Sequence, residues 1–320
     1  MHLRKLLAAL SLGVCAGWGQ AADPIHQELL DKHKPEKISG HVWMIQGPIG
    51  YPNPQNQGFM NNPGFIVTAD SVVVIDPGSS AAIGRAVVQH IKANTDKPVT
   101  HVLTTHVHGD HWLANQSIRD AWPDARFYAH PAMIKLATEG AAEFWLGNMD
   151  TLTEGATKGT QALIPTEALS NGQVLGVGGV NIKVHIAEGK VHSSTDAMFE
   201  VLEDKVLFTG DNFNNRRIVR MDDGSFAGSI RVADAALKLD IETIVPGHGP
   251  KGGKQVLNYY RNYLDTVYGS VKTLRESMEA FEMKPKIAEK LGDFKDWQGL
   301  DDELGKHISL GVLEAEQEDF

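Results

Sequence analysis

A short stretch of the sequence, T-T-H-V-H-G-D-H-W at residues 104–112, is crowded with side chains that bind metal ions. Neutral imidazole nitrogens and carboxylate oxygens are good ligands for zinc-like cations. Surface loops also collect histidine and aspartate by chance. Such a cluster within six positions, directly after a predicted buried strand, instead favours a metal site. Its members are His106, His108, Asp110 and His111.

Three further ligand-type residues follow other predicted strands. His192 lies in G-K-V-H-S-S-T-D, Asp211 ends L-F-T-G-D, and His248 lies in V-P-G-H-G-P, where the flanking glycines allow a sharp turn. Each alone is weak evidence, because a single histidine after a strand is usually only a polar surface residue. Together with the first four they fit two metal ions and an open coordination site better than one closed structural site.

The elements that must position these residues are short apolar strands and amphipathic helices. Strands are predicted at residues 42–46, 64–68, 72–76, 100–105, 127–129 and 243–245, and hairpins at 174–186 and 198–208. Helical periodicity covers residues 81–93, 112–121 and 226–239. Hairpins in each half, each followed by helices, predict an α/β protein with two sheets packed face to face and helices outside, a four-layer αββα sandwich.

Two longer segments interrupt this pattern. Residues 47–63 are crowded with Gly, Pro and Asn and are too long for a hairpin turn. We expect a flap over a pocket there, with Tyr51, Phe59 and Met60 as its apolar contacts, although a plain surface loop would have the same composition. Residues 131–165 are rich in Ala, Glu and Leu and predict a helical insertion.

The sequence resembles the metallo-β-lactamase superfamily over roughly residues 38–250. V-V-V-I-D-P-G at residues 72–78, the H-x-H-x-D-H signature at 106–111, and the three later ligand positions occur in the family's order. The resemblance implies two divalent metal ions, zinc in the first instance with iron or manganese as alternatives. It implies that the first ion is held by His106, His108 and His192, the second by Asp110, His111 and His248, and that Asp211 bridges both. Asp76 would orient a ligand histidine through a hydrogen bond.

The bridging position separates branches of this family. β-Lactamases usually carry Cys or Ser there, whereas Asp211 resembles glyoxalase II and the lactonase-like and thioesterase-like branches. Diiron oxygen-reducing relatives carry Glu at the second signature histidine, which is His108 here. The segment after His192 departs from the common G-H-T-P-G form, so the groove beside it does not transfer from the family.

These features predict an exported dinuclear hydrolase that cleaves an ester, thioester or lactone-like bond of a small molecule through a metal-bridging hydroxide. Asp110 would be catalytic as well as a ligand, because it can help to hold the proton of the nucleophile. The alternatives are a mononuclear iron sulfur dioxygenase-like enzyme, a β-lactamase, and a non-enzymatic metal-binding accessory of a periplasmic redox system. A Ser193–His192 pair is disfavoured, because neighbouring residues at a strand end rarely face each other.

The N-terminus predicts export. Arg4 and Lys5 precede an apolar run from Leu6 to Trp18, and small residues allow cleavage after residue 21. A buried helix and a lipoprotein signal at Cys15 are the alternatives. We expect residues 1–21 to be a signal peptide and the mature protein to be periplasmic, with no membrane anchor. Without Cys15, the only cysteine, it has no thiolate for a metal or a disulfide.

The remaining chain divides into a metallo-β-lactamase-fold domain, residues 22–253, and a helical extension, residues 254–320. N-Y-Y-R-N-Y-L-D-T-V at residues 258–267 resembles exported hydrolases associated with quinoprotein or sulfur-oxidation systems. Helix packing against the sandwich is the alternative reason for its tyrosines. The net charge of -10 and the lack of a clustered Lys/Arg surface argue against nucleic acid as a partner.

Overall fold

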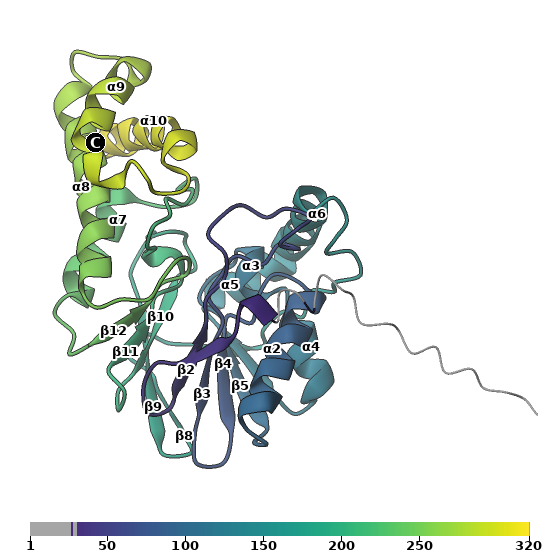
Figure 1. Ribbon diagram of the computed structural model, residues 1–320. Helices are drawn as coiled ribbons and strands as arrows, with labels where there is room; N and C mark the ends of the chain where they lie inside the picture. Colours follow the sequence, from purple (N-terminus) through teal and green to yellow (C-terminus); the bar gives the residue numbers. More distant parts are fainter. Residues whose placement is uncertain (1–26, 28–30, 320) are drawn as a thin grey trace, which may run out of the picture.

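The strands form two sheets that lie next to each other and share an apolar layer (Figure 1). The computed structural model describes residue 27 and residues 31–319. The predicted signal peptide, residues 1–21, lies outside this part of the chain.

The first sheet comes from the N-terminal half of the chain. Its strands, in spatial order, are β1 (Pro35–Lys37), β2 (Val42–Ile45), β3 (Gly64–Val67), β4 (Val72–Ile75), β5 (Val99–Leu103), β6 (Arg126–Ala129) and β7 (Glu167–Ala168). Strands β1 to β4 pair antiparallel, and β4 to β7 pair parallel. Side chains alternate between the two faces of a strand. In β4, Val73 and Ile75 therefore face the shared layer, while Val72 and Val74 belong to the layer under the outer helices.

The second sheet contains both predicted hairpins. Its strands run in the spatial order β12 (Thr243–Val245), β11 (Val206–Phe208), β10 (Ala197–Val201), β9 (Val180–Ile186) and β8 (Val174–Val177). In β10, Phe199 and Val201 enter the shared layer, and Met198 packs on the opposite face.

Helices cover the outer face of each sheet. On the first sheet these are α2 (Ala81–Asn94) and α4 (Asn115–Ala121), and on the second α7 (Phe226–Ala236) and α8 (Gln255–Leu274). Ser80 begins α2 by accepting a hydrogen bond from the backbone N–H of Ile83. The predicted αββα sandwich is confirmed.

The insertion at residues 131–165 is helical only in its first part. It contains α5 (Pro131–Leu136), a π-helical turn η1 (Ala137–Ala141) and α6 (Ala142–Leu152). The remainder forms turns and irregular chain, so the prediction was wrong beyond Leu152. Trp145 and Met149 of α6 are buried against Trp112, which attaches α6 beside the H-x-H-x-D-H segment.

The segment at residues 47–63 is fixed by side-chain amides. The Asn62 side chain accepts from the backbone N–H of Gly47 at 3.1 Å and donates to the carbonyls of Pro246 at 2.8 Å and Gly249 at 2.7 Å. The segment is thus attached on both sides of His248. We call residues 47–63 a wall, because they are fixed in place instead of forming a free flap.

The expected apolar contacts of this wall are correct for two of three residues. Tyr51 and Met60 line a cavity. Phe59 does not line that cavity; it is buried in the layer between the first sheet and its helices, next to Ile45. Its apolar ring belongs to the core, because the segment turns inward before it enters β3.

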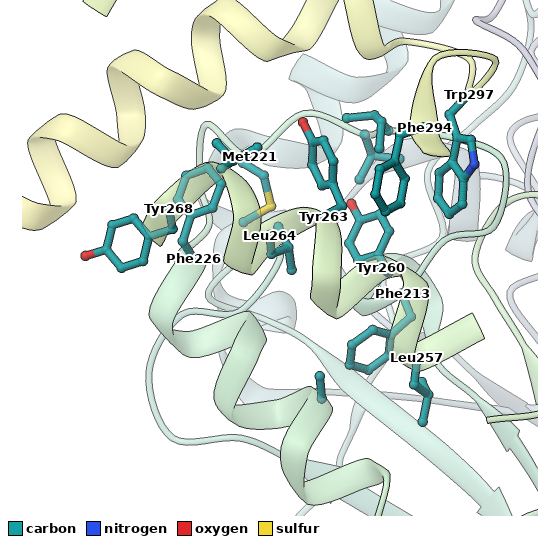
Figure 2. Close-up of a cluster of buried hydrophobic side chains, with 14 of the residues drawn as sticks. Phe213, Met221, Phe226, Leu257, Tyr260, Tyr263, Leu264, Tyr268, Phe294 and Trp297 are labelled. Atoms are coloured by element: carbon teal, nitrogen blue, oxygen red, sulfur yellow. The ribbon is translucent and has the colours of Figure 1, made fainter. Parts of the chain in front are cut away.

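The C-terminal extension folds back over α7. It consists of α8, α9 (Ala280–Lys290), a 3-10 turn η3 (Gly292–Phe294) and α10 (Leu300–Glu318), whose aromatic side chains pack together in Figure 2. Tyr260 and Tyr263 are buried in this cluster, whereas Tyr259 is 50% exposed. Within the described residues, no helix has the length and apolar character needed to cross a membrane.

Hydrogen bonds of the Glu314 and His307 side chains help to fasten α10. The Glu314 carboxylate accepts from the backbone N–H of Phe226 at 2.7 Å and of Ala227 at 3.0 Å, so it caps the first turn of α7. His307 is buried; its Nδ1 accepts from the Tyr263 hydroxyl at 2.8 Å and its Nε2 donates to the carbonyl of Val219 at 3.0 Å. The contact in which Nδ1 accepts needs the neutral imidazole, because both ring nitrogens of the protonated form are donors.

Candidate metal centre

The structure brings all seven predicted ligand residues together in two buried groups. The first group contains His106, His108, His192 and Asp211, and the second contains Asp110, His111 and His248. Within each group, one potential ligand atom per residue lies within 4.8 Å of the others.

Several chain turns at one edge of the sandwich supply these side chains. His106 and His108 follow β5, and Asp110 and His111 lie in a short helix, α3 (Gly109–Trp112). The remaining ligands come from the second sheet: His192 between β9 and β10, Asp211 in the 3-10 turn η2 (Gly210–Asn212) after β11, and His248 after β12. The centre therefore joins the two halves of the sandwich.

The glycine before His248 allows two of these turns to touch. A Cβ atom on Gly247 would overlap Oδ1 of Asp211, and it would lie 2.7 Å from the carbonyl carbon of Gly210. The backbone N–H of Gly247 also donates to the carbonyl of Gly210 at 2.9 Å. Only a residue without a side chain permits this approach.

The distances in the second group match tetrahedral coordination. His111 Nε2 lies 3.4 Å from Asp110 Oδ2 and 3.3 Å from Asp211 Oδ1, and His248 Nε2 lies 3.3 Å from Asp110 Oδ2. Zinc bonds of about 2.0 Å place the ligands of a tetrahedron about 3.3 Å apart. The spacing therefore suits a small divalent cation.

Asp211 also reaches the first group. Its Oδ2 lies 3.7 Å from His192 Nε2, and His192 Nε2 lies 3.0 Å from His108 Nδ1. Two imidazoles whose nitrogens face each other this closely need either a proton or a shared cation between them. The same Oδ2 lies 3.2 Å from His248 Nε2 of the second group, so the Asp211 carboxylate reaches both groups and has the placement of a bridging ligand.

Several of the inward-facing atoms are buried without a hydrogen-bond partner among the described residues. They include His106 Nε2, Asp110 Oδ2, His111 Nε2 and Asp211 Oδ1. Leaving a buried polar atom unsatisfied costs about 1–3 kcal/mol. Each of these nitrogen and oxygen atoms can coordinate a metal ion through a lone pair, which removes this cost. The residues present therefore fit a pair of divalent metal ions.

Hydrogen bonds behind the ligands fix their orientation. Asp76 Oδ2 accepts from His111 Nδ1 at 2.7 Å and from the Thr105 hydroxyl at 2.7 Å, and its Oδ1 accepts from the Thr105 backbone N–H at 2.8 Å. His248 Nδ1 donates to the carbonyl of Met60 at 2.7 Å. In both histidines Nε2 is left to face the centre. Asp76 has a φ of 49°, which is strained for a non-glycine residue and is typical of a functional position.

Electrostatics keep most ligands in their metal-binding forms. Burial alone would raise the pKa values of Asp110 and Asp211, but the adjacent His111 and His248 hold both pKa values well below the usual range. Burial and the neighbouring His108 lower the pKa of His192 to about 3. Burial opposes the charge on His111, but Asp110, Asp211 and Asp76 hold its pKa well above the usual value. Metal binding at His111 therefore releases a proton.

A cavity of about 330 Å³ opens onto the ligands. Its apolar wall includes Met60 and, from α6, Trp145, Met149 and Leu152; its charged wall consists of Arg217, Arg220, Asp222, Glu303 and Lys306. The charged wall was not predicted from the sequence, and part of it comes from α10. The Tyr51 hydroxyl donates to Asp302 at 3.2 Å and so ties the wall at residues 47–63 to α10. Burial, then Glu303 and Asp302, raise the pKa of Tyr51 to about 12.

The serine next to His192 is engaged elsewhere. The Ser193 hydroxyl donates to Asp196 Oδ1 at 2.9 Å and lies 2.9 Å from the Thr195 hydroxyl. Its backbone N–H also donates to Asp196. Ser193 therefore holds the loop that carries His192 and is not arranged as a nucleophile.

Comparisons with known proteins agree with this architecture. The family model described as the metallo-beta-lactamase superfamily matches residues 56–248, a span that contains all seven ligand-type residues. A probable metallo-hydrolase of Streptococcus pyogenes serotype M6 is 27% identical over 199 residues, which cover 58% of this chain and 78% of that relative.

Solved structures share the fold at lower identity. The metallo-beta-lactamase of Pontibacter korlensis is 18% identical with a TM-score of 0.58, covering 73% of this chain and 99% of that one. The metallo-beta-lactamase of Hirschia baltica is 19% identical with a TM-score of 0.54, covering 72% and 97%. At this identity the likeness is one of fold.

Proposed function

The chain belongs to the metallo-beta-lactamase superfamily, and we propose that it is an exported dinuclear hydrolase that cleaves an ester, thioester or lactone-like bond of a small molecule. The observation that carries the proposal is the placement of Asp211 between the two buried ligand groups. Its Oδ1 lies 3.3 Å from His111, and its Oδ2 lies 3.2 Å from His248 and 3.7 Å from His192. The relative described as a probable metallo-hydrolase supports the reaction class.

His106, His108 and His192 would hold one metal ion, Asp110, His111 and His248 the other, and Asp211 would contact both. Such a pair of cations, when bound, lowers the pKa of a shared water and polarises the bond to be cleaved. Asp110 is the proposed catalytic residue. Its carboxylate lies in the second ligand group, 3.3 Å from His248 Nε2, so besides binding metal it could help to hold a proton of the attacking water.

The substrate class rests on the same carboxylate. Asp211 places a carboxylate where β-lactamases of this fold usually carry Cys or Ser, as in the glyoxalase II, lactonase-like and thioesterase-like branches that the sequence resembles. The solved β-lactamases therefore support the fold of this chain and not its substrate. The resemblance of residues 258–267 to hydrolases of quinoprotein or sulfur-oxidation systems adds little, because Tyr260 and Tyr263 serve helix packing.

Metal content and activity test the proposal together. Protein purified without chelator should contain two equivalents of metal, and His106→Ala and Asp211→Ala should lose both metal and activity while the protein still folds. Ser193→Ala serves as the control and should keep most activity. A stable single equivalent of iron with sulfur oxidation would contradict the dinuclear hydrolase. Nitrocefin turnover above that of every aryl ester, thioester and lactone would refute the substrate class.

Export is proposed from residues 1–21 alone. The mature chain should begin at or near Ala22 and collect in the periplasm, with a net charge of -12 after the loss of Arg4 and Lys5 from the full chain at -10. Mass spectrometry of fractionated cells measures both. An intact Met1 in a cytoplasmic pool would contradict export without affecting the metal centre.

A further inference from the structure

A second cavity lies between the second sheet and α7 and has a volume of about 210 Å³. Its apolar side includes Met198 of β10 and Val232, Ala236 and Leu239, which come from α7 and the turn after it. No described residue lines both this cavity and the one above the metal centre. We call it the rear cavity. An apolar cavity of about 150 Å³ is large enough to bind benzene, so the rear cavity has room for a small organic molecule.

Asp196 gives the rear cavity a buried carboxylate. The residue is 7% exposed, and its oxygens accept from the backbone N–H of Ser193 at 2.6 Å and from the Ser193 hydroxyl at 2.9 Å. A carboxylate has about four acceptor sites, so capacity for a ligand remains. Within residues 31–319, Asp196 forms no ion pair with a Lys, Arg or His side chain. A buried charge is normally paired, because burying it alone is costly.

Asn212 adds a second group without a partner. It lines the rear cavity and is 4% exposed, and its Oδ1 is buried with no hydrogen-bond partner among the described residues. Such an unsatisfied acceptor is unfavourable and rare in native proteins. His185, which also lines the cavity, differs because its Nε2 already lies 2.7 Å from Glu200. The Asp196 charge and the Asn212 oxygen therefore both lack a donor.

We propose that the rear cavity binds a small primary amine, with its ammonium group paired with Asp196 and its apolar body against Met198 and α7. An ammonium carries a positive charge and three N–H donors and has no acceptor, so it supplies what Asp196 and Asn212 lack. The apolar side of the cavity favours a hydrocarbon body, because its burial removes apolar surface from water. Asn212 directly follows Asp211, so a bound amine lies next to the turn that carries this ligand-type residue.

Equilibrium binding tests the charge of the site. Binding of benzylamine and of the neutral benzyl alcohol to zinc-loaded protein is measured by calorimetry at about pH 8, where the amine is protonated. Burial raises the pKa of Asp196 to about 6, so its carboxylate is ionised under these conditions. The amine should bind more tightly than the alcohol. Asp196→Asn, which keeps the shape but not the charge, should reduce this preference by roughly tenfold to hundredfold, the range of a hydrogen bond to a charged group.

Asn212→Leu separates a ligand contact from a structural role. Leucine is similar in size but has no acceptor, so benzylamine affinity should fall by about three- to tenfold. The thermal midpoint of the unliganded protein should not fall, because Asn212 Oδ1 has no partner to lose within the described chain. A lower midpoint with unchanged affinity would contradict the role given to Asn212.

A change in the size of one side chain tests the location. Ala235 lines the rear cavity from an exposed position of α7. Ala235→Phe should occupy space that both probes need and weaken each by about tenfold or more. Ala235→Ser is the matched control, because it stays small, and both affinities should remain within about twofold of the wild type. Metal content should be unchanged in both variants, because the cavity above the metal centre is separate.

Two results would overturn the proposal. Equal binding of the amine and the alcohol to the wild type would refute the cation site. Unchanged benzylamine binding in both Asp196→Asn and Ala235→Phe would place the amine elsewhere, for example on the zinc ions. The thermal midpoint reports whether each variant is folded, and Asn212→Leu and Ala235→Phe carry the test if Asp196→Asn is not. None of these measurements involves hydrolysis, so the proposed function can fail while this site stands.

Discussion

Replacing Gly247 by alanine should damage the metal centre without changing any ligand. The new methyl group would overlap Oδ1 of Asp211 and lie 2.7 Å from the carbonyl carbon of Gly210 and 2.9 Å from the backbone nitrogen of Asp211. Because two of these contacts are with backbone, no rotamer change relieves them. The turn that carries Asp211 must therefore move away from the one that carries His248.

The expected size of the effect follows from that displacement. Contacts of this kind normally exceed 3.0 Å, and relieving all three requires the carboxylate to move by about 1 Å, a misplacement that costs about 10²-fold in rate. The overpacking itself should cost roughly 1–3 kcal/mol of stability. Metal content by elemental analysis, kcat/KM on the best ester or thioester, and the thermal midpoint measure the three consequences separately.

Gly147→Ala is the matched control. Gly147 lies inside α6, and a Cβ there would meet nothing within 4 Å. Alanine should stabilise the helix by roughly 0.5–1 kcal/mol and leave the metal content unchanged. If Gly247→Ala kept two metals and activity within about twofold of the wild type, the close approach of these turns would not be what places Asp211.

Three further predictions concern other parts of the molecule. Asp76→Asn puts an amide N–H where the carboxylate accepts hydrogen bonds from Thr105 and His111. Metal affinity, measured by competition with a chelator, should therefore fall about 10- to 100-fold. Unchanged affinity would show that the orientation of His111 has another source. Burial lowers the pKa of His307 to about 4 from its usual 6.5, so the unfolded chain takes up the proton first, and stability should fall by roughly 3 kcal/mol as pH drops from about 6.5 to 4. Denaturant titrations of wild type and His307→Gln across this range should converge at low pH, and a constant difference would disprove the assignment. Glu314→Gln replaces one accepting oxygen at the start of α7 by a donor, and it should cost roughly 1 kcal/mol and increase amide hydrogen exchange in α7 and α10, with the exposed Glu316→Gln unchanged.

The clustering of the seven ligand-type residues was predictable because their signal is local. The H-x-H-x-D-H segment is contiguous, and each of the other three follows a recognisable strand, so spacing alone placed them at one edge of the sandwich. Arg217 carries no such signal. In the sequence R-R-I-V-R it is one arginine among three, and only the packing shows that it is buried without a carboxylate while Arg220 is paired.

Tertiary contacts also explain why the other cavity residues and the burial of Phe59 were not predicted from the sequence. Glu303 and Lys306 look like ordinary charged positions of an amphipathic helix. They lie some two hundred residues after His108 in the sequence, and nothing in α10 itself indicates that they line the same cavity as His108. Phe59 and Met60 are neighbouring apolar residues, so the sequence predicts the same kind of contact for both. The inward turn of the chain, set by contacts such as that of Asn62 with Pro246, decides which ring enters the core.

Helix α10 follows every ligand-type residue in the sequence, and this order sets which parts of the site are synthesised first. Synthesis runs from the N-terminus, and the earlier part of a chain emerges first. All seven ligand residues, the last of which is His248, precede the residues of α10 that line the cavity, Glu303 and Lys306. A chain stopped before residue 300 would hold every metal ligand but lack that side of the cavity and the capping carboxylate of Glu314. The ligand-type residues are thus synthesised before the residues that complete the cavity.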